Sequence, residues 1–215
     1  MKTAGLIVNG KITDYPKIAG YISACDYIVA ADGGANFLYD MKITPDYIIG
    51  DMDSIKANVF QYYTEKGVKT KKYPPQKDWT DSEIALKLLK ELNYKKIHMF
   101  GAYGDRADHF LSNLDMLYLS DSLGLELTIV DENWRIFLVK EGTTIIGVKS
   151  GQTVSFNSIS GNVSGITLKG FKYPLSDYTL YMGNSRMTSN IAEIDSPGIS
   201  IAEGSLLCTI IDEKA

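Results

Sequence analysis

The chain has 215 residues, of which 45% are hydrophobic and 22% charged, and its formal net charge is −4. This length is enough for one large domain or two modest ones with cores of their own, and we expect two. The negative charge argues against a nucleic-acid partner, and the absence of a signal-peptide core or of a run near the roughly 20 apolar residues of a membrane span predicts a cytoplasmic protein with no membrane contact.

Strands and helices are predicted to alternate through residue 130. Short apolar runs predict strands at 4–8, 27–30, 47–49, 96–100 and 125–130, and the segment 68–73, which ends at a proline pair, is also predicted to be a strand. Helices are predicted at 16–25, after the glycines at 33–34, at 55–66, behind Thr80 and from about 109 to 123. This alternation is typical of a Rossmann-like α/β domain with a largely parallel sheet, in which ligands bind outside the carboxyl ends of the strands.

The third predicted strand ends in an acidic loop. Gly50 follows the apolar run and is followed by Asp51 and Asp53. Two carboxylates one residue apart on an extended segment point the same way, and Mg²⁺ is commonly bound by one or two carboxylates together with substrate phosphates. Taken alone, this pattern also fits an ordinary polar turn after a strand.

The second strand ends in Asp32 and then the glycine pair Gly33 and Gly34, with Asn36 behind it. A strand, a glycine-rich turn and a helix can offer free backbone N–H groups to a phosphate. Neither a Rossmann fingerprint nor a Walker A motif is present, and a glycine pair alone also fits a tight turn. We therefore treat these residues as candidates for binding a nucleotide.

Thr80 begins the best-defined helix of the chain. Thr80 and Glu83 fit a capping box, and apolar residues follow at helical spacing. Asp81 would lie at the positive end of this helix, preceded by Gln76 and Lys77, where it could meet a metal-bound phosphate. A well-capped amphipathic helix accounts for the same pattern without any ligand.

The fifth strand runs into a segment that contains Arg106, Asp108 and His109. Arg106 could bind a phosphate through two hydrogen bonds, whereas His109 fits a functional or a structural role equally well. Four strand ends thus carry acidic groups. Like charges gathered at one sheet edge repel one another unless a cation or a protonated ligand offsets them, so together these ends predict a functional site that binds one of the two.

Beyond residue 130 the helical pattern stops. Short alternating runs are separated by turn residues up to residue 211, which predicts an antiparallel β sandwich or barrel. We therefore divide the chain into domains at 1–130 and 131–215. The exposed edge strands of such a small β domain would be covered naturally in a dimer.

The assembled motifs resemble those of the thiamine pyrophosphokinase family over nearly the whole chain. They are ADGGAN at 31–36, GDMDS at 50–54, QKDWTDSE at 76–83, GAYGDRADH at 101–109, GFKYPL at 170–175 and the pair at 189–190. The resemblance implies a Mg²⁺-dependent homodimer that transfers the pyrophosphoryl group of ATP to the hydroxyl of thiamine and releases AMP. It implies a first domain that binds ATP and a second that binds thiamine.

The resemblance also suggests roles for individual residues. Mg²⁺ and the triphosphate would be bound by Asp51, Asp53 and Asp81. The other residues expected in the ATP site are Asp32, Gly33, Gly34, Asn36, Gln76, Lys77, Thr80, Arg106, Asp108 and His109. Thiamine would be bound by Ser189, Asn190 and Tyr173, with the first two supplied by the opposite subunit. Either Asp108 or Asp32 could serve as the general base.

An acidic pocket suits thiamine because its thiazolium ring carries a fixed positive charge. Trp134, Tyr173 and Tyr181 could stack on its rings, although aromatic residues also serve as core. Two other functions remain open. One is a metal-dependent nucleotide or sugar-nucleotide hydrolase or transferase, and the other is a sensing module that binds a nucleotide or vitamin without turnover.

Overall fold

The computed structural model describes residues 2–74, 76 and 78–212. The chain forms two compact units, Met1–Glu132 and Asn133–Ala215. Within the described ranges, none of the helices combines the length and apolar character that crossing a membrane requires. Each unit is described separately below.

The first unit is built on a parallel sheet. Its strands are β1 (Thr3–Ile7), β2 (Tyr27–Ala31), β3 (Tyr47–Gly50), β4 (Lys69–Lys72), β5 (Lys96–Phe100) and β6 (Glu126–Val130). They follow the order β6-β5-β1-β2-β3-β4, and every pairing among them is parallel. The chain therefore winds outward from β1 to β4 and then returns to the other side of β1, which creates a switch point between β1 and β5.

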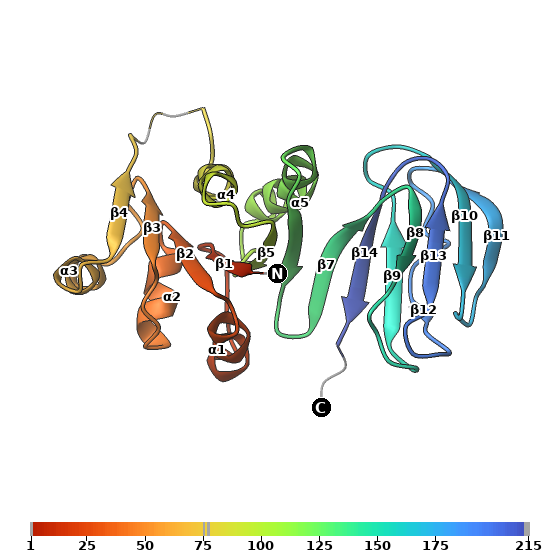
Figure 1. Cartoon of the computed structure of the whole chain (residues 1–215), viewed down its shortest axis with the longest axis horizontal. Coiled ribbons are helices and arrows are strands. Elements are labelled where there is room, and N and C mark those ends of the chain that lie inside the picture. Colours follow the sequence, from red (N-terminus) through yellow and green to blue (C-terminus); the bar gives the residue numbers. More distant parts are fainter. Residues whose placement is uncertain (1, 75, 77, 213–215) are drawn as a thin grey trace. The chain divides into compact units, whose positions relative to one another are not determined.

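Helices cover both faces of this sheet (Figure 1). They are α1 (Tyr15–Ser23), α2 (Gly34–Asp40), α3 (Ala57–Glu65), α4 (Asp81–Glu91) and α5 (Ala107–Ser122). The first three share a core with one face of the strands, where Ile18, Leu38 and Tyr63 are buried against Ile48. The helix α4 packs on the other face, against β1 to β3, and contacts α5. Burial on both faces explains why the inner strands are apolar runs, whereas the edge strand β4 is exposed and carries lysines.

The second unit is an antiparallel sandwich. Its strands are β7 (Trp134–Val139), β8 (Gly142–Ile145), β9 (Thr153–Asn157), β10 (Val163–Lys169), β11 (Leu175–Leu180), β12 (Asn190–Ile191), β13 (Gly198–Ile201) and β14 (Leu206–Ile211). One sheet has the order β12-β9-β14-β7 and the other β11-β10-β13-β8. A single core joins them, with Phe156 of one sheet buried together with Ile166 and Ile199 of the other.

The predicted fold class is thus confirmed, and the second unit is a sandwich rather than a barrel. The element bounds differ from the predictions at several ends. The helix expected at 55–66 begins at Ala57, because the acidic loop continues as far as Lys56, whose backbone N–H donates to Asn36 Oδ1.

Candidate active site

A cavity of about 670 Å³ lies at the carboxyl ends of the strands of the first unit. Its wall comes from the loops after β1, β2, β3 and β5, from the first turn of α4 and from the first two turns of α5. Seven of the residues predicted from the sequence line it: Asp32, Asp51, Asp53, Thr80, Asp81, Arg106 and His109. Residues spread over nearly eighty positions of the sequence therefore meet in one place.

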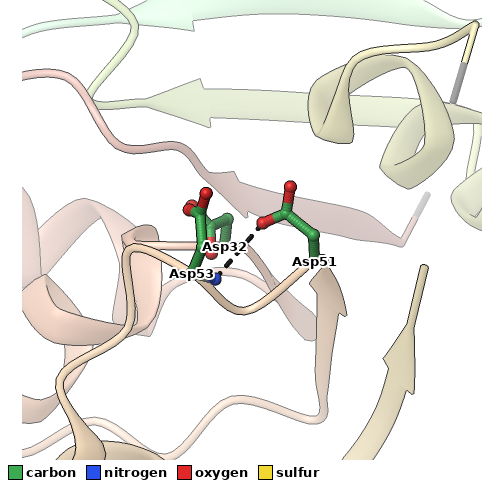
Figure 2. Close-up of side chains that lie close together, drawn as sticks. All are labelled: Asp32, Asp51 and Asp53. Carbon is green, nitrogen blue, oxygen red and sulfur yellow. Dashed lines mark hydrogen bonds between the residues drawn. The ribbon is translucent and has the colours of Figure 1, made fainter. Parts of the chain in front are cut away.

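Asp32, Asp51 and Asp53 form the centre of this site. Each offers a carboxylate oxygen, and these oxygens all lie within 4.8 Å of one another. Figure 2 shows the three side chains together, with the Asp53 backbone N–H donating to Asp51 Oδ1 over 3.2 Å. Ser54 contacts two of them, since its N–H donates to Asp32 Oδ1 and its hydroxyl donates to Asp53 Oδ1. These bonds fix the carboxylates without neutralising their charge.

The backbone at both strand ends adopts unusual conformations. Asp32 has φ of 45° and Met52 φ of 67°, a region that few residues other than glycine occupy. At Gly50, with φ of 145°, a Cβ atom would lie 3.1 Å from both the Asp32 Cβ and the Asp81 Oδ1. Gly50 therefore lets three acidic segments approach closely. Strained residues of this kind gather at functional sites.

Asn36 supports the acidic loop from behind. Its Nδ2 donates to the Ser54 carbonyl over 2.9 Å, and its Oδ1 accepts from the Lys56 N–H over 3.0 Å. Asn36 is not part of the cavity wall, and neither are Gly33, Gly34 and Gln76. Gly34 instead allows α2 to pack on β1, where any Cβ would overlap the Ile7 carbonyl. Lys77 lies outside the described residues.

The first turn of α4 is anchored on both sides. Thr80 caps the helix, with its hydroxyl accepting from the Glu83 N–H over 3.2 Å, so the predicted cap is present. Ser82 lies 3.4 Å from Asn113 Oδ1, and the buried Asn113 donates through Nδ2 to the Ala102 carbonyl over 2.8 Å. This connection holds the start of α4 against α5 and the loop after β5, and with it the position of Asp81 in the cavity wall.

Arg106 and Asp108 occupy different positions in this arrangement. Arg106 and His109 line the cavity, whereas Asp108 does not. Asp108 accepts two hydrogen bonds from the Arg106 guanidinium, which hold the pKa of the Asp108 carboxyl well below its ordinary value. A carboxylate that gives up its charge so reluctantly is a weak proton acceptor near neutral pH.

The donor set of the central group suits a hard cation. It consists of carboxylate oxygens from neighbouring strand ends, with a hydroxyl and backbone groups close by. Mg²⁺ prefers such oxygen ligands and takes only one or two carboxylates when substrate phosphates complete its shell. The cavity therefore has room and ligands for a cation bound together with an anionic substrate.

Comparison with known proteins identifies the family. The profile described as "Thiamin pyrophosphokinase, catalytic domain" matches residues 18–129, more than half of the chain. The chain belongs to the thiamin pyrophosphokinase family. A second profile, "Thiamin pyrophosphokinase, vitamin B1 binding domain", matches residues 142–206 within the second unit. The family resemblance of the motifs is thereby confirmed.

Curated and solved relatives cover most of the chain. It is 29% identical to the thiamine pyrophosphokinase of Bacillus subtilis, over 96% of this chain and 97% of that protein. It is 27% identical to thiamine pyrophosphokinase 1 of Oryza sativa, over 85% of this chain and 77% of that protein. The crystal structure of the Bacillus subtilis protein superposes with a TM-score of 0.88 at 26% identity, covering 99% of this chain and 100% of that one. The crystal structure of the thiamin pyrophosphokinase of Geobacillus thermodenitrificans superposes with a TM-score of 0.86 at 26% identity, covering 99% of this chain and 99% of that one.

The residues suggested for thiamine binding lie in the second unit of this family member. Asn190 is buried, and its side chain makes three hydrogen bonds: Oδ1 accepts from the N–H groups of Tyr173 and Ile191, and Nδ2 donates to the Tyr173 carbonyl. Ser189 has φ of 58° and donates its N–H to the Ser155 hydroxyl. Tyr173 is 57% exposed. Asn190 therefore fixes the backbone that presents Tyr173.

Several residues of the cavity wall were not predicted from the sequence. They are Val8, Asn9, Gly10, Ala31, Ser54, Ser82, Ala102, Gly104, Asp105, Ser112 and Asn113. Asn113 did carry a signal, because it is an amide on the same face of α5 as the apolar Met116 and Leu117. Asn9 and Gly10 carried only the signal of a turn.

Proposed function

We propose that this protein transfers the pyrophosphoryl group of ATP to the hydroxyl group of thiamine, giving thiamine diphosphate and AMP. Membership of the thiamin pyrophosphokinase family supports the reaction. The observation that carries it is the convergence of Asp32, Asp51 and Asp53 in a cavity that Arg106 also lines. Both kinds of group would suit a triphosphate, because the carboxylates would hold a cation that offsets the phosphate charge and Arg106 would add a positive charge of its own.

Magnesium fits the central carboxylates of this site. Asp32, Asp51 and Asp53 are the residues that would hold it, and Asp81 lies next to them in the cavity wall. The sequence placed Asp81 among the ligands and Asp32 outside them, whereas the grouping of the oxygens favours Asp32. When bound, Mg²⁺ would offset the charge of the phosphate chain and help to orient it. Arg106 would contribute a further positive charge.

At the β-phosphorus of ATP, the reaction forms one P–O bond and breaks another. The thiamine hydroxyl oxygen attacks the β-phosphorus of ATP, the bond from that phosphorus to the oxygen bridging to the α-phosphate breaks, and AMP leaves with the electron pair. The hydroxyl proton passes to a base. Asp108 lies outside the cavity wall, and Asp32 is one of the residues that would hold the cation, so the geometry favours neither of them as the base. The other contribution of the protein would be to position the reacting groups, and the hydrogen bonds of Ser54 and Asn36 support this by fixing the acidic loop.

Thiamine would enter as a cation attracted by an acidic cavity. The exposed Tyr173, presented by Asn190, is a candidate to contact one of its rings. The protein would work as a homodimer, in which the exposed edge strands of the second unit would be covered. We also expect a cytoplasmic enzyme. Size-exclusion chromatography with light scattering tests the dimer directly.

An AMP-release assay tests the function. Purified protein is incubated with ATP and Mg²⁺, with and without thiamine, and AMP and thiamine diphosphate are measured. AMP that forms only with thiamine supports the kinase, whereas nucleotide products without thiamine indicate the hydrolase. Binding of ATP without turnover under any condition indicates a sensing module.

Two variants sharpen this assay. Asp53→Ala removes a ligand of the carboxylate group and should lower AMP release by a factor of about 100 or more, with a higher Mg²⁺ requirement. Asp115→Asn removes a charge from an exposed position on α5 outside the cavity wall, so its activity should match that of the wild type. Equal losses in both variants would argue against a specific metal site.

A further inference from the structure

The loop that follows β1 is locked between two other segments of the site. The Val8 N–H donates to the Phe100 carbonyl over 2.9 Å, and the Gly10 N–H donates to the Gly101 carbonyl over 2.8 Å. A Cβ atom at Gly10 would overlap the carbonyl oxygens of Gly101 and Tyr103. The loop thus fits against the segment after β5 with no room for a side chain at Gly10. These contacts fix the position of its backbone.

Asn9 extends from this fixed loop onto the start of α2. A Cβ atom at Gly33 would overlap the Cγ, Oδ1 and Nδ2 atoms of Asn9, so the carboxamide lies directly on the Gly33 backbone. Gly33 follows Asp32, one of the three central carboxylates. Asn9 also lines the cavity and is exposed. A neutral hydrogen-bonding group is therefore held within the cavity wall beside the carboxylates.

The usual structural reasons for an asparagine do not apply to Asn9. Asparagine is favoured in turns because it tolerates positive φ and because its side chain bonds to nearby backbone. Asn9 is not among the described residues with positive φ. Its side chain makes no hydrogen bond to another residue of the described part of the chain. The carboxamide thus has unused hydrogen-bonding capacity that faces a ligand cavity.

We propose that Asn9 binds the phosphate chain of the nucleotide by donating hydrogen bonds from its carboxamide. This inference rests on the proposed function and adds a residue to it. An Nδ2 group offers two donors and no charge, so it can stabilise a phosphate oxygen without competing with the carboxylates for the cation. A negative charge at the same place would repel the phosphates and join Asp32 and Asp51 in a crowded acidic site.

Three variants test this role by calorimetric titration with ATP and Mg²⁺ in the absence of thiamine. Asn9→Ala removes the donors and should weaken ATP binding about 10-fold, the effect of one hydrogen bond to a charged group. Asn9→Asp keeps the shape but replaces donors by charge, so it should weaken binding about 100-fold. Asn58→Asp makes the same change on the exposed side of α3, outside the cavity wall, and should bind ATP like the wild type.

Steady-state kinetics and a second ligand separate the possible roles. For a phosphate contact, Asn9→Ala should raise the KM for ATP about 10-fold, leave the KM for thiamine and the Tm unchanged, and weaken binding of inorganic tripolyphosphate with Mg²⁺ by a similar factor. If tripolyphosphate binding is unchanged while ATP binding weakens, Asn9 contacts the base or ribose and the proposal is overturned. ATP binding within twofold of the wild type in a folded Asn9→Asp variant would also overturn it.

Failure of the proposed function gives a different result. A wild-type protein that binds ATP but forms no AMP with thiamine would refute the kinase reaction. The titrations with ATP and tripolyphosphate would still decide whether Asn9 contacts the phosphate chain, since they need no turnover.

Discussion

Arg106 and Asp108 form a two-point ion pair at the start of α5, with Arg106 Nε 2.9 Å from Asp108 Oδ1 and Nη2 2.6 Å from Oδ2. Both side chains are largely exposed, so the pair contributes little to overall stability. Its geometry is more informative than its energy. Because Arg106 lines the cavity and Asp108 lies outside the wall, the carboxylate fixes the position of a guanidinium in the cavity wall.

The first prediction follows from this pair. Asp108→Asn should raise the KM for ATP about 10-fold with little change in kcat, because Arg106 loses the partner that orients it. In an Arg106→Ala background the same substitution should have almost no further effect. A double-mutant cycle of KM values measures this coupling.

A general-base role for Asp108 predicts a different pattern. Asp108→Asn would then lower kcat by a factor of about 100 or more, whether or not Arg106 is present. The Arg106 hydrogen bonds keep the pKa of Asp108 far below its ordinary value, so Asp108 stays ionised at neutral and mildly acidic pH. No limb of the kcat profile near neutral pH should therefore disappear in Asp108→Asn. Loss of such a limb would contradict the positioning role.

The second prediction concerns Glu132, the last residue of the first unit. Its carboxylate accepts from the backbone N–H groups of Thr13 and Asp14 and from the Thr13 hydroxyl. Burial alone would raise the pKa of Glu132, but these hydrogen bonds outweigh it and the pKa lies below its ordinary value. Glu132→Gln should therefore lower the free energy of unfolding at pH 7 by about 1–3 kcal/mol, measured by urea denaturation.

The pH dependence gives this prediction its sign. A carboxyl group whose pKa is lowered on folding contributes stability above its unfolded pKa of about 4.3, and the contribution is lost as the pH falls toward the lower folded value. The difference between wild type and Glu132→Gln should accordingly shrink below about pH 4. Glu126→Gln, at an exposed position of β6, is the control and should show no comparable difference at either pH.

The fold was largely readable from the sequence because its physical causes are local. Apolar runs bounded by glycine and asparagine predicted the strands, and Thr80 with its downstream apolar spacing predicted α4. The strand order was not readable, since it depends on which strands pair across long loops. A sandwich and a barrel could not be distinguished in the second unit for the same reason. The core that Phe156 and Ile166 share joins segments far apart in the chain.

The candidate site was readable where charge made the residue conspicuous. Asp32, Asp51 and Asp53 stood out because acidic groups at strand ends have few structural uses. The uncharged residues of the cavity wall did not stand out. Asn9 resembled any turn residue, and its value emerges only from the contact with Gly33, a relationship between two loops that no local pattern encodes.

The third prediction tests how Asn190 organises the second unit. Asn190→Ala would leave the Tyr173 N–H and carbonyl and the Ile191 N–H without their partners. The free energy of unfolding should fall by about 1–3 kcal/mol, and trypsin should cleave the native protein faster after Lys172. Asn184→Ala, an exposed position nearby, provides the control. Equal cleavage rates in both variants would mean that Asn190 does not fix this segment.

The fourth prediction contrasts two glycines. Gly10→Ala places a methyl group onto the carbonyl oxygens of Gly101 and Tyr103, which are backbone atoms and cannot turn away as a side chain would. Overpacking of this kind costs about 1–3 kcal/mol or more. Because Gly10 also lines the cavity, the KM for ATP should rise together with the loss of stability. Urea denaturation and steady-state kinetics measure the two effects.

Gly20→Ala is the matched control for Gly10→Ala. Gly20 lies inside α1, where an added Cβ meets no atom within 4 Å. The substitution removes backbone freedom from the unfolded chain and should raise the free energy of unfolding by about 0.5–1 kcal/mol without changing the KM for ATP. The same exchange should thus have opposite signs at the two positions. If Gly10→Ala were as stable as the wild type, the close fit between the loops after β1 and β5 would be refuted, and with it the fixed position of Asn9.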